Sequence, residues 1–338
     1  MGKRYWIYAI ILCCLGSPAR AAGIQLLDSD PNLAGAIWYP CAGGPKDVPL
    51  GSLAMPVVDS LRGVKDCPVT GTKLPLVIVS HGRGGWFGGH NDTAEALADA
   101  GFIVAAINHP GDNGNDSSRR DSLSVLASRP ADIIRLLDFV LNDWRDRAAI
   151  DHAKIGFFGF SAGAFTGLVL AGGNPDLRKR SCPESDRSRG CEELRSDDIP
   201  SNPPHESRIR AAVLADTALN YTFTQEGLAG IQISLQVWRS ELGGGSVDPA
   251  GTARVASSLP GKPDIQTVPA GHFAFLPPCP PPLAAAVPRI CTDVPAGFDR
   301  AAFHRDFDAS IVRFFQEHLA SACPGLSRTC SGIGAGSR

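Results

Sequence analysis

Continuous apolar runs of strand length alternate with helix-periodic segments through the middle of the chain. The strand-length runs cover residues 74–80, 102–108 and 154–160, and the segments 92–100 and 131–143 between them have apolar side chains at helical spacing. Strands without polar alternation are typical of sheets that are buried on both faces. Strands that alternate with helices predict βαβ units, and therefore an α/β fold with a mostly parallel central sheet flanked by helices.

The alternation of strands and helices resumes in the C-terminal half. Predicted strands cover residues 209–215, 231–238 and 265–269, and predicted helices cover residues 249–259 and 301–319. Two N-terminal segments, 23–28 and 35–39, have the pattern of antiparallel strands at an edge of the sheet. All of these elements fit one sheet, so we expect a single domain over residues 22–338.

A polar segment, residues 173–207, separates the two halves of this pattern. Asn, Pro, Asp, Arg and Ser dominate it, and hydrophobic periodicity is lost. We expect it to be a surface insert that follows the helix after residue 161. The Pro-rich run 277–282 and the tail after Ala320 are expected to be loops.

The first residues have the pattern of a secretory leader. Lys3 and Arg4 precede an eleven-residue apolar run, and Ala19-Arg20-Ala21 has the small residues that signal peptidase requires. The run is too short to span a bilayer. We therefore expect residues 1–21 to be a signal peptide that is cleaved near Ala21, and the protein to be secreted or periplasmic.

Composition and charge narrow the possible partners. Hydrophobic residues make up 43% of the 338 residues and charged residues 20%, as in ordinary globular proteins. A net charge of −2 provides no global positive field for a polyanion. We therefore expect no nucleic-acid partner and no stable membrane anchor; the sequence leaves the oligomeric state open.

Eight cysteines lie beyond the predicted leader. An even number in an exported protein favours disulfides over metal ligation. Their grouping along the chain suggests four local pairs: Cys41–Cys67, Cys182–Cys191, Cys279–Cys291 and Cys323–Cys330.

Ser161 is the predicted nucleophile. It is the centre of Gly159-Phe160-Ser161-Ala162-Gly163, which matches G-x-S-x-G, although this match is weak alone because the chain contains 37 glycines. Its context is more specific, since a predicted strand ends at the motif and a small-residue helix follows. This is the strand–turn–helix that a nucleophile elbow requires.

His272 is the predicted base, since a hydroxyl needs a base to accept its proton. It follows the last predicted strand, at the sheet edge where ligands bind in open α/β folds. His81, His90 and His109 lie too early for the chain order Ser, acid, His, and His304 lies inside the final helix, where we expect a surface or packing role.

The acid that orients the base has two main candidates. Asp216 ends one predicted strand and Glu241 follows the next, and we favour Asp216 while Glu241 remains the alternative. Asp248 also lies nearby, but it precedes a predicted helix and is more simply an N-cap.

The oxyanion hole needs two aligned backbone N–H donors. Ala162, the residue after the nucleophile, supplies one. The loop His81-Gly82-Arg83-Gly84-Gly85 after the strand 74–80 supplies the other, and Arg83 is the expected donor because the surrounding glycines allow close approach to a substrate carbonyl.

No pattern in the sequence predicts a metal or another cofactor. Neither a GxxxxGK[ST] phosphate loop nor an HExxH zinc motif occurs. The acidic run 112–116 resembles the start of a calcium loop, but Ser117 and Leu123 occupy the positions that require Gly and Glu.

Several motifs together resemble those of bacterial α/β-hydrolases described as predicted dienelactone hydrolases, and are similar to secreted platelet-activating-factor acetylhydrolases. The motifs are residues 81–85, 101–112, 129–132, 159–163 and 271–276. The resemblance implies the α/β-hydrolase fold and Ser–Asp–His ester chemistry without metal or cofactor. It also implies that Asp216 is the acid and that Arg83 and Ala162 are the oxyanion donors.

The resemblance leaves the substrate open. Dienelactone hydrolases attack with Cys, whereas this chain has Ser161, and the charged insert is not a lipid-docking amphipathic helix. We expect a small-molecule ester with a short acyl chain. The alternatives are a phospholipid deacetylase, a polyester hydrolase or, in a different class, a catalytically silent hydrolase-fold protein that binds a partner through the insert.

Overall fold

The computed structural model describes residues 20–200 and 202–319. Most of the predicted signal peptide, the tail after Leu319 and the predicted pair Cys323–Cys330 lie outside these described residues.

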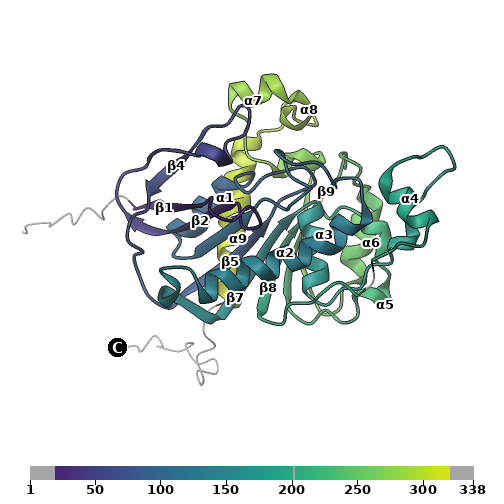
Figure 1. Ribbon diagram of the computed structural model, residues 1–338, viewed down its shortest axis with the longest axis horizontal. Helices are drawn as coiled ribbons and strands as arrows, with labels where there is room; N and C mark the ends of the chain where they lie inside the picture. The colour runs from purple at the N-terminus through teal and green to yellow at the C-terminus, as the bar shows by residue number, and fades with distance from the viewer. Residues whose placement is uncertain (1–19, 201, 320–338) are drawn as a thin grey trace, which may run out of the picture.

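A ten-stranded mixed sheet crosses the centre of the molecule (Figure 1). In chain order its strands are β1 (Arg20–Leu27), β2 (Gly35–Ala42), β3 (Lys46–Pro49), β4 (Ser60–Lys65), β5 (Leu74–Ser80), β6 (Ile103–Ile107), β7 (Ile150–Phe160), β8 (Ile209–Ala215), β9 (Ser234–Ser240) and β10 (Asp264–Val268). Across the sheet they run β10-β9-β8-β7-β5-β6-β2-β1-β4-β3. The six strands from β10 to β6 are mutually parallel, and β2 is antiparallel to both of its neighbours.

Helices cover both faces of the sheet (Figure 1). Those described are α1 (Asn91–Asp99), α2 (Leu123–Asn142), α3 (Ala162–Leu170), α4 (Arg189–Arg195), α5 (Gln225–Leu228), α6 (Pro249–Ser258), α7 (Pro281–Ala286), α8 (Pro288–Cys291) and α9 (Arg300–Leu319). Apolar side chains of α2, α3 and α6 share one hydrophobic cluster with the sheet, and those of α1 and α9 share the other. The predicted three-layer α/β architecture is therefore confirmed.

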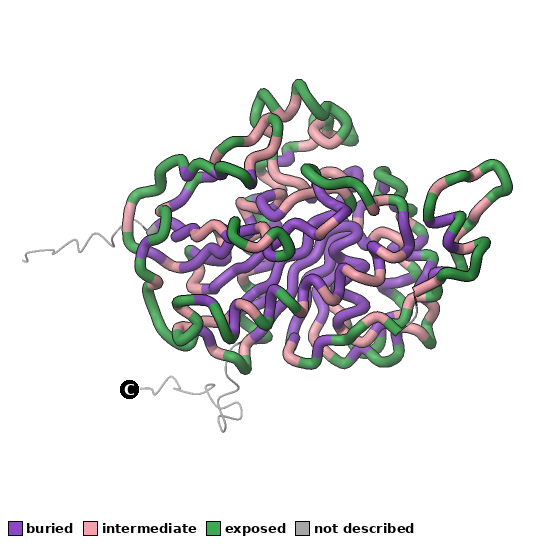
Figure 2. The backbone as a smooth tube through the Cα atoms, in the orientation of Figure 1, coloured by how far each residue is buried: buried purple, intermediate pink, exposed green. Residues whose placement is uncertain are grey.

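Strand β5 shows why its sequence is continuously apolar. Leu76 and Ile78 pack into the cluster beneath α2 and α3, whereas Val77 and Val79 pack into the cluster beneath α1 and α9. Because successive side chains point to opposite faces, a strand covered on both sides needs apolar residues at every position. Figure 2 shows the resulting buried centre.

Two predictions about the elements were wrong. The predicted edge strands 23–28 and 35–39 are antiparallel, but they lie inside the sheet because β4 and β3 continue it beyond β1. The run 277–282, expected to be a loop, contains the start of α7 at Pro281. Proline is tolerated in the first helical turn because the N–H that it lacks has no intrahelical partner there.

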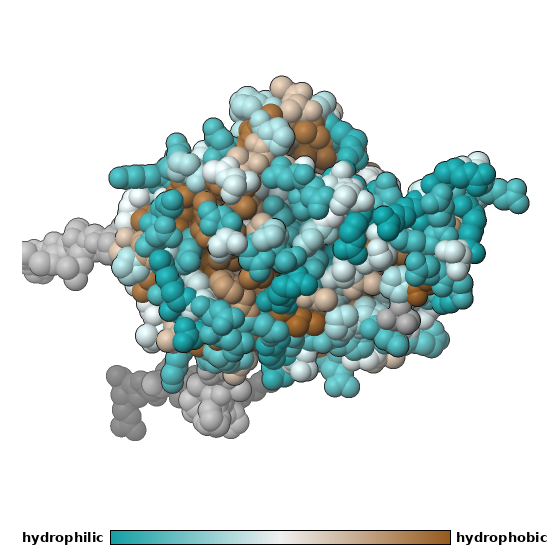
Figure 3. Space-filling view, in the orientation of Figure 1, coloured by the Kyte–Doolittle hydropathy of each residue, from teal (hydrophilic) through white to brown (hydrophobic). Residues whose placement is uncertain are grey.

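The polar segment 173–207 carries α4, and its described part projects at the right of the view (Figure 1) with a largely hydrophilic surface (Figure 3). Two contacts hold this segment in place. The carboxylate of Glu193 accepts a hydrogen bond from the backbone N–H of Leu123, at the start of α2. A disulfide joins Cys182 to Cys191.

Three of the four predicted cysteine pairs are formed: Cys41–Cys67, Cys182–Cys191 and Cys279–Cys291. Within residues 20–200 and 202–319, we find no helix whose length and hydropathy would let it cross a bilayer.

The loop lengths predict unequal contributions of two disulfides to stability. The half-cystines of Cys41–Cys67 are 26 residues apart and those of Cys182–Cys191 are 9 apart. Replacing the first pair by alanine should lower the free energy of unfolding by about 3.5 kcal/mol, and replacing the second pair by about 2.5 kcal/mol, because the longer loop gains more entropy in the unfolded chain. Urea unfolding of the two double variants measures this, and a larger loss for Cys182 and Cys191 would contradict it.

Candidate active site

Ser161 lies in a sharp turn between β7, which ends at Phe160, and α3, which begins at Ala162. Its backbone has φ 57° and ψ −115°, a conformation that is strained for a residue with a side chain. The Ser161 N–H donates to Ala215 O at 2.8 Å, and the Ser161 carbonyl accepts from Ala218 N–H at 3.1 Å. Hydrogen bonds to the end of β8 and to the loop that follows it therefore hold the strained turn in place.

The two glycines of the motif allow this turn to form. A Cβ atom at Gly163 would lie 1.9 Å from the carbonyl oxygen of Ser80, and a Cβ atom at Gly159 would lie 2.3 Å from the carbonyl oxygen of Gly163. Neither contact can be relieved by rotating a side chain, because backbone meets backbone. The spacing of the pentapeptide thus reflects the close approach of α3 to β5 and β7.

Ser161, His272 and Asp216 form a continuous hydrogen-bonded series. His272 Nε2 lies 3.0 Å from Ser161 Oγ, and His272 Nδ1 lies 2.6 Å from Asp216 Oδ2. A carboxylate partner at Nδ1 favours the tautomer with its proton on that nitrogen, which leaves Nε2 free to accept the serine proton. The three side chains are 6%, 2% and 0% exposed, respectively.

Asp216 is held at the end of β8 by its neighbour strand. Its Oδ1 accepts from the backbone N–H of Ser240 at 2.9 Å, and its Oδ2 accepts from the Ser240 hydroxyl at 2.7 Å. A fully buried carboxylate needs such donors to offset the loss of water. Ser240 was not identified from the sequence, although its position at the end of β9 was a usable signal.

The structure separates the three acid candidates. Asp216 contacts His272, whereas Glu241 is exposed and its backbone N–H donates to Val268 O. Asp248 caps α6, accepting from the N–H groups of Ala250 and Gly251 at 3.2 and 2.9 Å. Asp248 is therefore the N-cap that the sequence predicts.

The imidazole of His272 is fixed by its backbone and its ring. The backbone N–H donates to Gly243 O at 2.7 Å, and the ring stacks on Phe160 with 4.7 Å between centroids. His272 begins the short 3₁₀ helix η5 (His272–Phe275). Loop and strand contacts therefore set the direction in which Nε2 points.

The loop 81–85 packs directly against the serine turn. A Cβ atom at Gly82 would lie 3.2 Å from Ser161 Cβ, so this loop passes at contact distance. Ala162 is the first residue of α3, and the first N–H groups of a helix have no intrahelical acceptor. Arg83 and Ala162 are thus on two segments that flank Ser161, as the predicted oxyanion donors must be.

A buried ion pair holds this loop from below. Asp112 Oδ1 accepts from Gly84 N–H at 2.9 Å, and Asp112 Oδ2 pairs with Arg129 Nη1 at 2.7 Å. Arg129, which is fully buried in α2, also donates to the carbonyl oxygen of His81. Sequence reasoning missed both roles; a charged Arg within an otherwise apolar helical face was the available signal.

A second Ser–His–Asp series lies beneath the same loop. His109 Nε2 lies 2.9 Å from Ser80 Oγ, and His109 Nδ1 lies 3.1 Å from Asp132 Oδ2. Burial lowers the pKa of His109 well below its usual value, and the charge of Arg129 lowers it further. Ser80 is 0% exposed and lies within β5, so this series supports the loop and does not face a substrate.

Two other features could bind ligands. Among the described residues, Asp92, His304 and Asp308 form a compact group of metal-ligand type, but His304 is hydrogen-bonded to Asp92 and we assign the group no metal.

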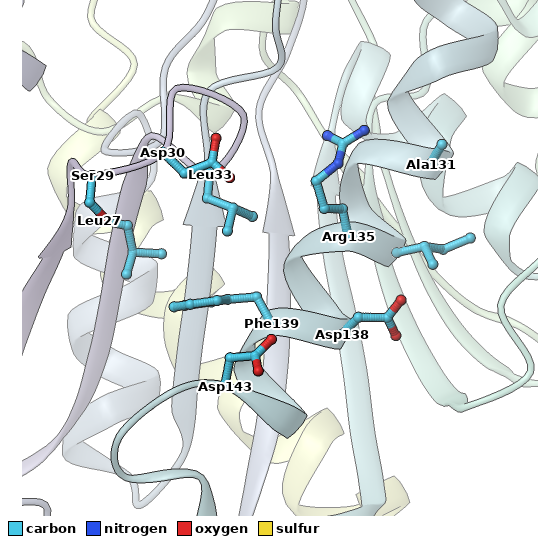
Figure 4. A pocket seen from close by; sticks show the side chains of 10 residues that line it. Leu27, Ser29, Asp30, Leu33, Ala131, Arg135, Asp138, Phe139 and Asp143 are labelled. Atoms are coloured by element: carbon cyan, nitrogen blue, oxygen red, sulfur yellow. The ribbon is translucent and has the colours of Figure 1, made fainter.

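A groove of about 690 Å³ lies between α2 and the turn after β1 (Figure 4). Leu33, Phe139 and Asp143 are among its lining residues, and Ser161 is not.

Comparison with known proteins identifies the fold. No family model and no curated protein matches the chain. One similar solved structure is a ferulic acid esterase from Streptomyces cinnamoneus, which is 20% identical, with 94% of this chain and 96% of that chain covered and a TM-score of 0.57. The α/β-hydrolase fold predicted from the sequence is thereby confirmed; the narrower likeness to dienelactone hydrolases and acetylhydrolases stays a prediction.

The acid assignment predicts opposite effects of two substitutions. Asp216→Asn should lower kcat for p-nitrophenyl acetate by about 10⁴-fold, because His272 loses the partner that fixes its tautomer. Glu241→Gln should stay within about tenfold of the parent, as an exposed carboxylate outside the series. Steady-state kinetics on folded variants, checked by circular dichroism, gives the answer. Loss of turnover in Glu241→Gln alone would reverse the assignment.

The oxyanion assignment predicts that the backbone of residue 83 matters more than its side chain. The Arg83 guanidinium is exposed and pairs with Asp121, so Arg83→Ala should leave kcat within about threefold. Arg83→Pro removes the N–H and should lower kcat by about 10²- to 10³-fold. Equal kcat values for these two variants, at matched melting temperatures, would exclude Arg83 N–H as a donor.

Proposed function

We propose that the protein is an exported serine carboxylic-ester hydrolase that acts on small, short-acyl esters through an acyl-enzyme. The observation that carries this proposal is the series Ser161–His272–Asp216, with distances of 3.0 and 2.6 Å, on a strained turn at a helix N-terminus. Nucleophile, base and orienting acid have the chain order and the hydrogen bonds that acyl transfer requires.

The residues of the candidate site have distinct roles in the proposed reaction. Ser161 Oγ attacks the ester carbonyl while His272 Nε2 takes its proton, and Asp216 stabilises the imidazolium that forms. The N–H groups of Arg83 and Ala162 donate to the oxyanion of the tetrahedral intermediate. His272 then protonates the leaving alcohol, and water releases the acid in the reverse sequence.

The ester class is supported by the fold comparison and by the site itself. The similar structure is a ferulic acid esterase, which favours an ester over other acyl compounds. The alternatives, a phospholipid deacetylase and a polyester hydrolase, use the same chemistry and differ in the group that the site must accept. The proposed steps use side chains and backbone N–H groups of this chain alone.

Export is proposed on two grounds. The predicted leader covers residues 1–21, of which Arg20 and Ala21 are also the first two residues of β1, and three disulfides link the described part of the chain. Such crosslinks persist in the periplasm or outside the cell and are rare in the cytosol.

A panel of p-nitrophenyl esters from acetyl to palmitoyl tests both the activity and the acyl preference. We expect Ser161→Ala to abolish turnover to the level of the uncatalysed reaction and activity to fall beyond about eight acyl carbons, because a short-acyl pocket cannot enclose a longer chain. Equal rates for the parent and Ser161→Ala would instead support the silent binding protein. A preference for long-chain emulsions would refute the short-acyl assignment.

A further inference from the structure

His304 is a buried histidine on α9 whose two ring nitrogens both have oxygen partners. Nδ1 lies 2.6 Å from Asp92 Oδ2 on α1, and Nε2 lies 2.9 Å from the carbonyl oxygen of Ala274. The residue is 3% exposed. Neither the sequence motifs nor the proposed acyl transfer accounts for it.

The partners of His304 determine its protonation state. A carbonyl oxygen only accepts, so Nε2 must donate to Ala274, and an ionised carboxylate only accepts, so Nδ1 must donate to Asp92. Burial opposes ionisation of Asp92, but the hydrogen bond from His304 and its charge outweigh burial and lower the pKa of Asp92. With both nitrogens donating, the ring is an imidazolium.

Other titratable groups around His304 favour the same state. Burial lowers the pKa of His90 to about 4, so that ring is neutral. Burial, together with the charge of Asp92, raises the pKa of Asp308 to about 7, and Thr93 Oγ1 donates to this carboxyl at 2.7 Å. Glu95 on α1 is the further acid whose charge acts on Asp308. The charge of ionised Asp308 favours a protonated His304 as well, and neutral His90 adds no competing positive charge.

The two hydrogen bonds join three elements that flank the candidate site. Ala274 is two residues after His272, within η5, the same short 3₁₀ helix. Asp92 is in the first turn of α1, the helix that follows the loop 81–85. One side chain on α9 thus connects the turn that carries the base to the helix behind the oxyanion loop.

We propose that His304 is a positioning residue for His272: its imidazolium, by donating to both Asp92 and the Ala274 carbonyl, holds η5 so that His272 Nε2 stays within hydrogen-bonding distance of Ser161. This inference rests on the proposed function. The distance at stake is 3.0 Å, and a displacement of about 1 Å at such a point can cost about 10²-fold in rate.

The proposal implies a loss of positioning at alkaline pH. Burial opposes the charge of His304, but the hydrogen bond and charge of Asp92 outweigh burial, so the pKa is raised above its usual value. A raised pKa in the folded state means that the contribution to stability is fully present below the unfolded pKa of about 6.5 and is lost as pH rises through the folded value. A neutral ring has one N–H, so one of the two hydrogen bonds is then lost.

Three substitutions on α9 test the role of the side chain. His304→Leu removes both donors, and His304→Gln keeps a neutral amide N–H that can reach the Ala274 carbonyl. His318→Leu repeats the first change on an exposed histidine of the same helix. We expect His304→Leu to lower kcat by about 10²-fold with KM within about threefold, His304→Gln to recover at least about tenfold, and His318→Leu to match the parent.

The pH profile separates positioning from a purely structural role. We expect the alkaline fall in kcat that accompanies deprotonation of His304 to be absent in His304→Gln, whose donor does not titrate. A kcat within about threefold of the parent for folded His304→Leu, judged by circular dichroism at the assay temperature, would overturn the proposal. So would a kcat loss fully explained by unfolding at that temperature.

One measurement is independent of ester turnover. Nitrogen-15 NMR of the histidine side chains in the full chain should show both ring nitrogens of His304 protonated near neutral pH, and this signal should vanish in His304→Leu. A singly protonated ring, or stoichiometric zinc retained by the parent and lost in His304→Leu, would overturn the proposal. If His304 is doubly protonated but ester turnover does not depend on Ser161, the proposed function is refuted. The hydrogen bonds from the His304 imidazolium to Asp92 and Ala274 would then still stand.

Discussion

The geometry of the site depends on one close backbone contact, between Gly163 and the carbonyl oxygen of Ser80. The start of α3 lies against the end of β5 at this point, directly after the strained turn at Ser161. The loop 81–85 begins at the same end of β5, directly after Ser80. A larger residue at position 163 would therefore move Ser161 and the start of α3 away from the loop 81–85, which carries the second expected oxyanion donor.

The remaining side chains of the site are supplied by the ends of neighbouring parallel strands. β8 ends next to Asp216 and β9 ends at Ser240, and these two residues are hydrogen-bonded to each other. Parallel strands place their carboxyl ends along one edge of the sheet, so residues far apart in sequence meet there. The strands β2, β1 and β4, which continue the sheet beyond β6, contribute core packing and none of the three residues of the series.

Sequence reasoning identified the residues and elements that short local patterns encode. Ser161 and His272 follow from a pentapeptide, its flanking elements and the chain order, and β5 and β8 have the predicted bounds. Asp216 and Glu241 both follow strands, so only tertiary contacts distinguish them. Arg129 and His304 were missed because their partners lie on other elements, and β4 because its sequence, SLRGVK, is short and half polar.

The segment that contains α7 and α8 begins directly after η5, and its end lies beside its start. Cys279 and Cys291 close it covalently, and the carbonyl oxygen of Val294 accepts from the backbone N–H of Gly271. A segment whose two ends are linked in this way can change in length and composition without moving the backbone on either side of it. This segment can accordingly diverge between related proteins, and be exchanged by design, while His272 keeps its place.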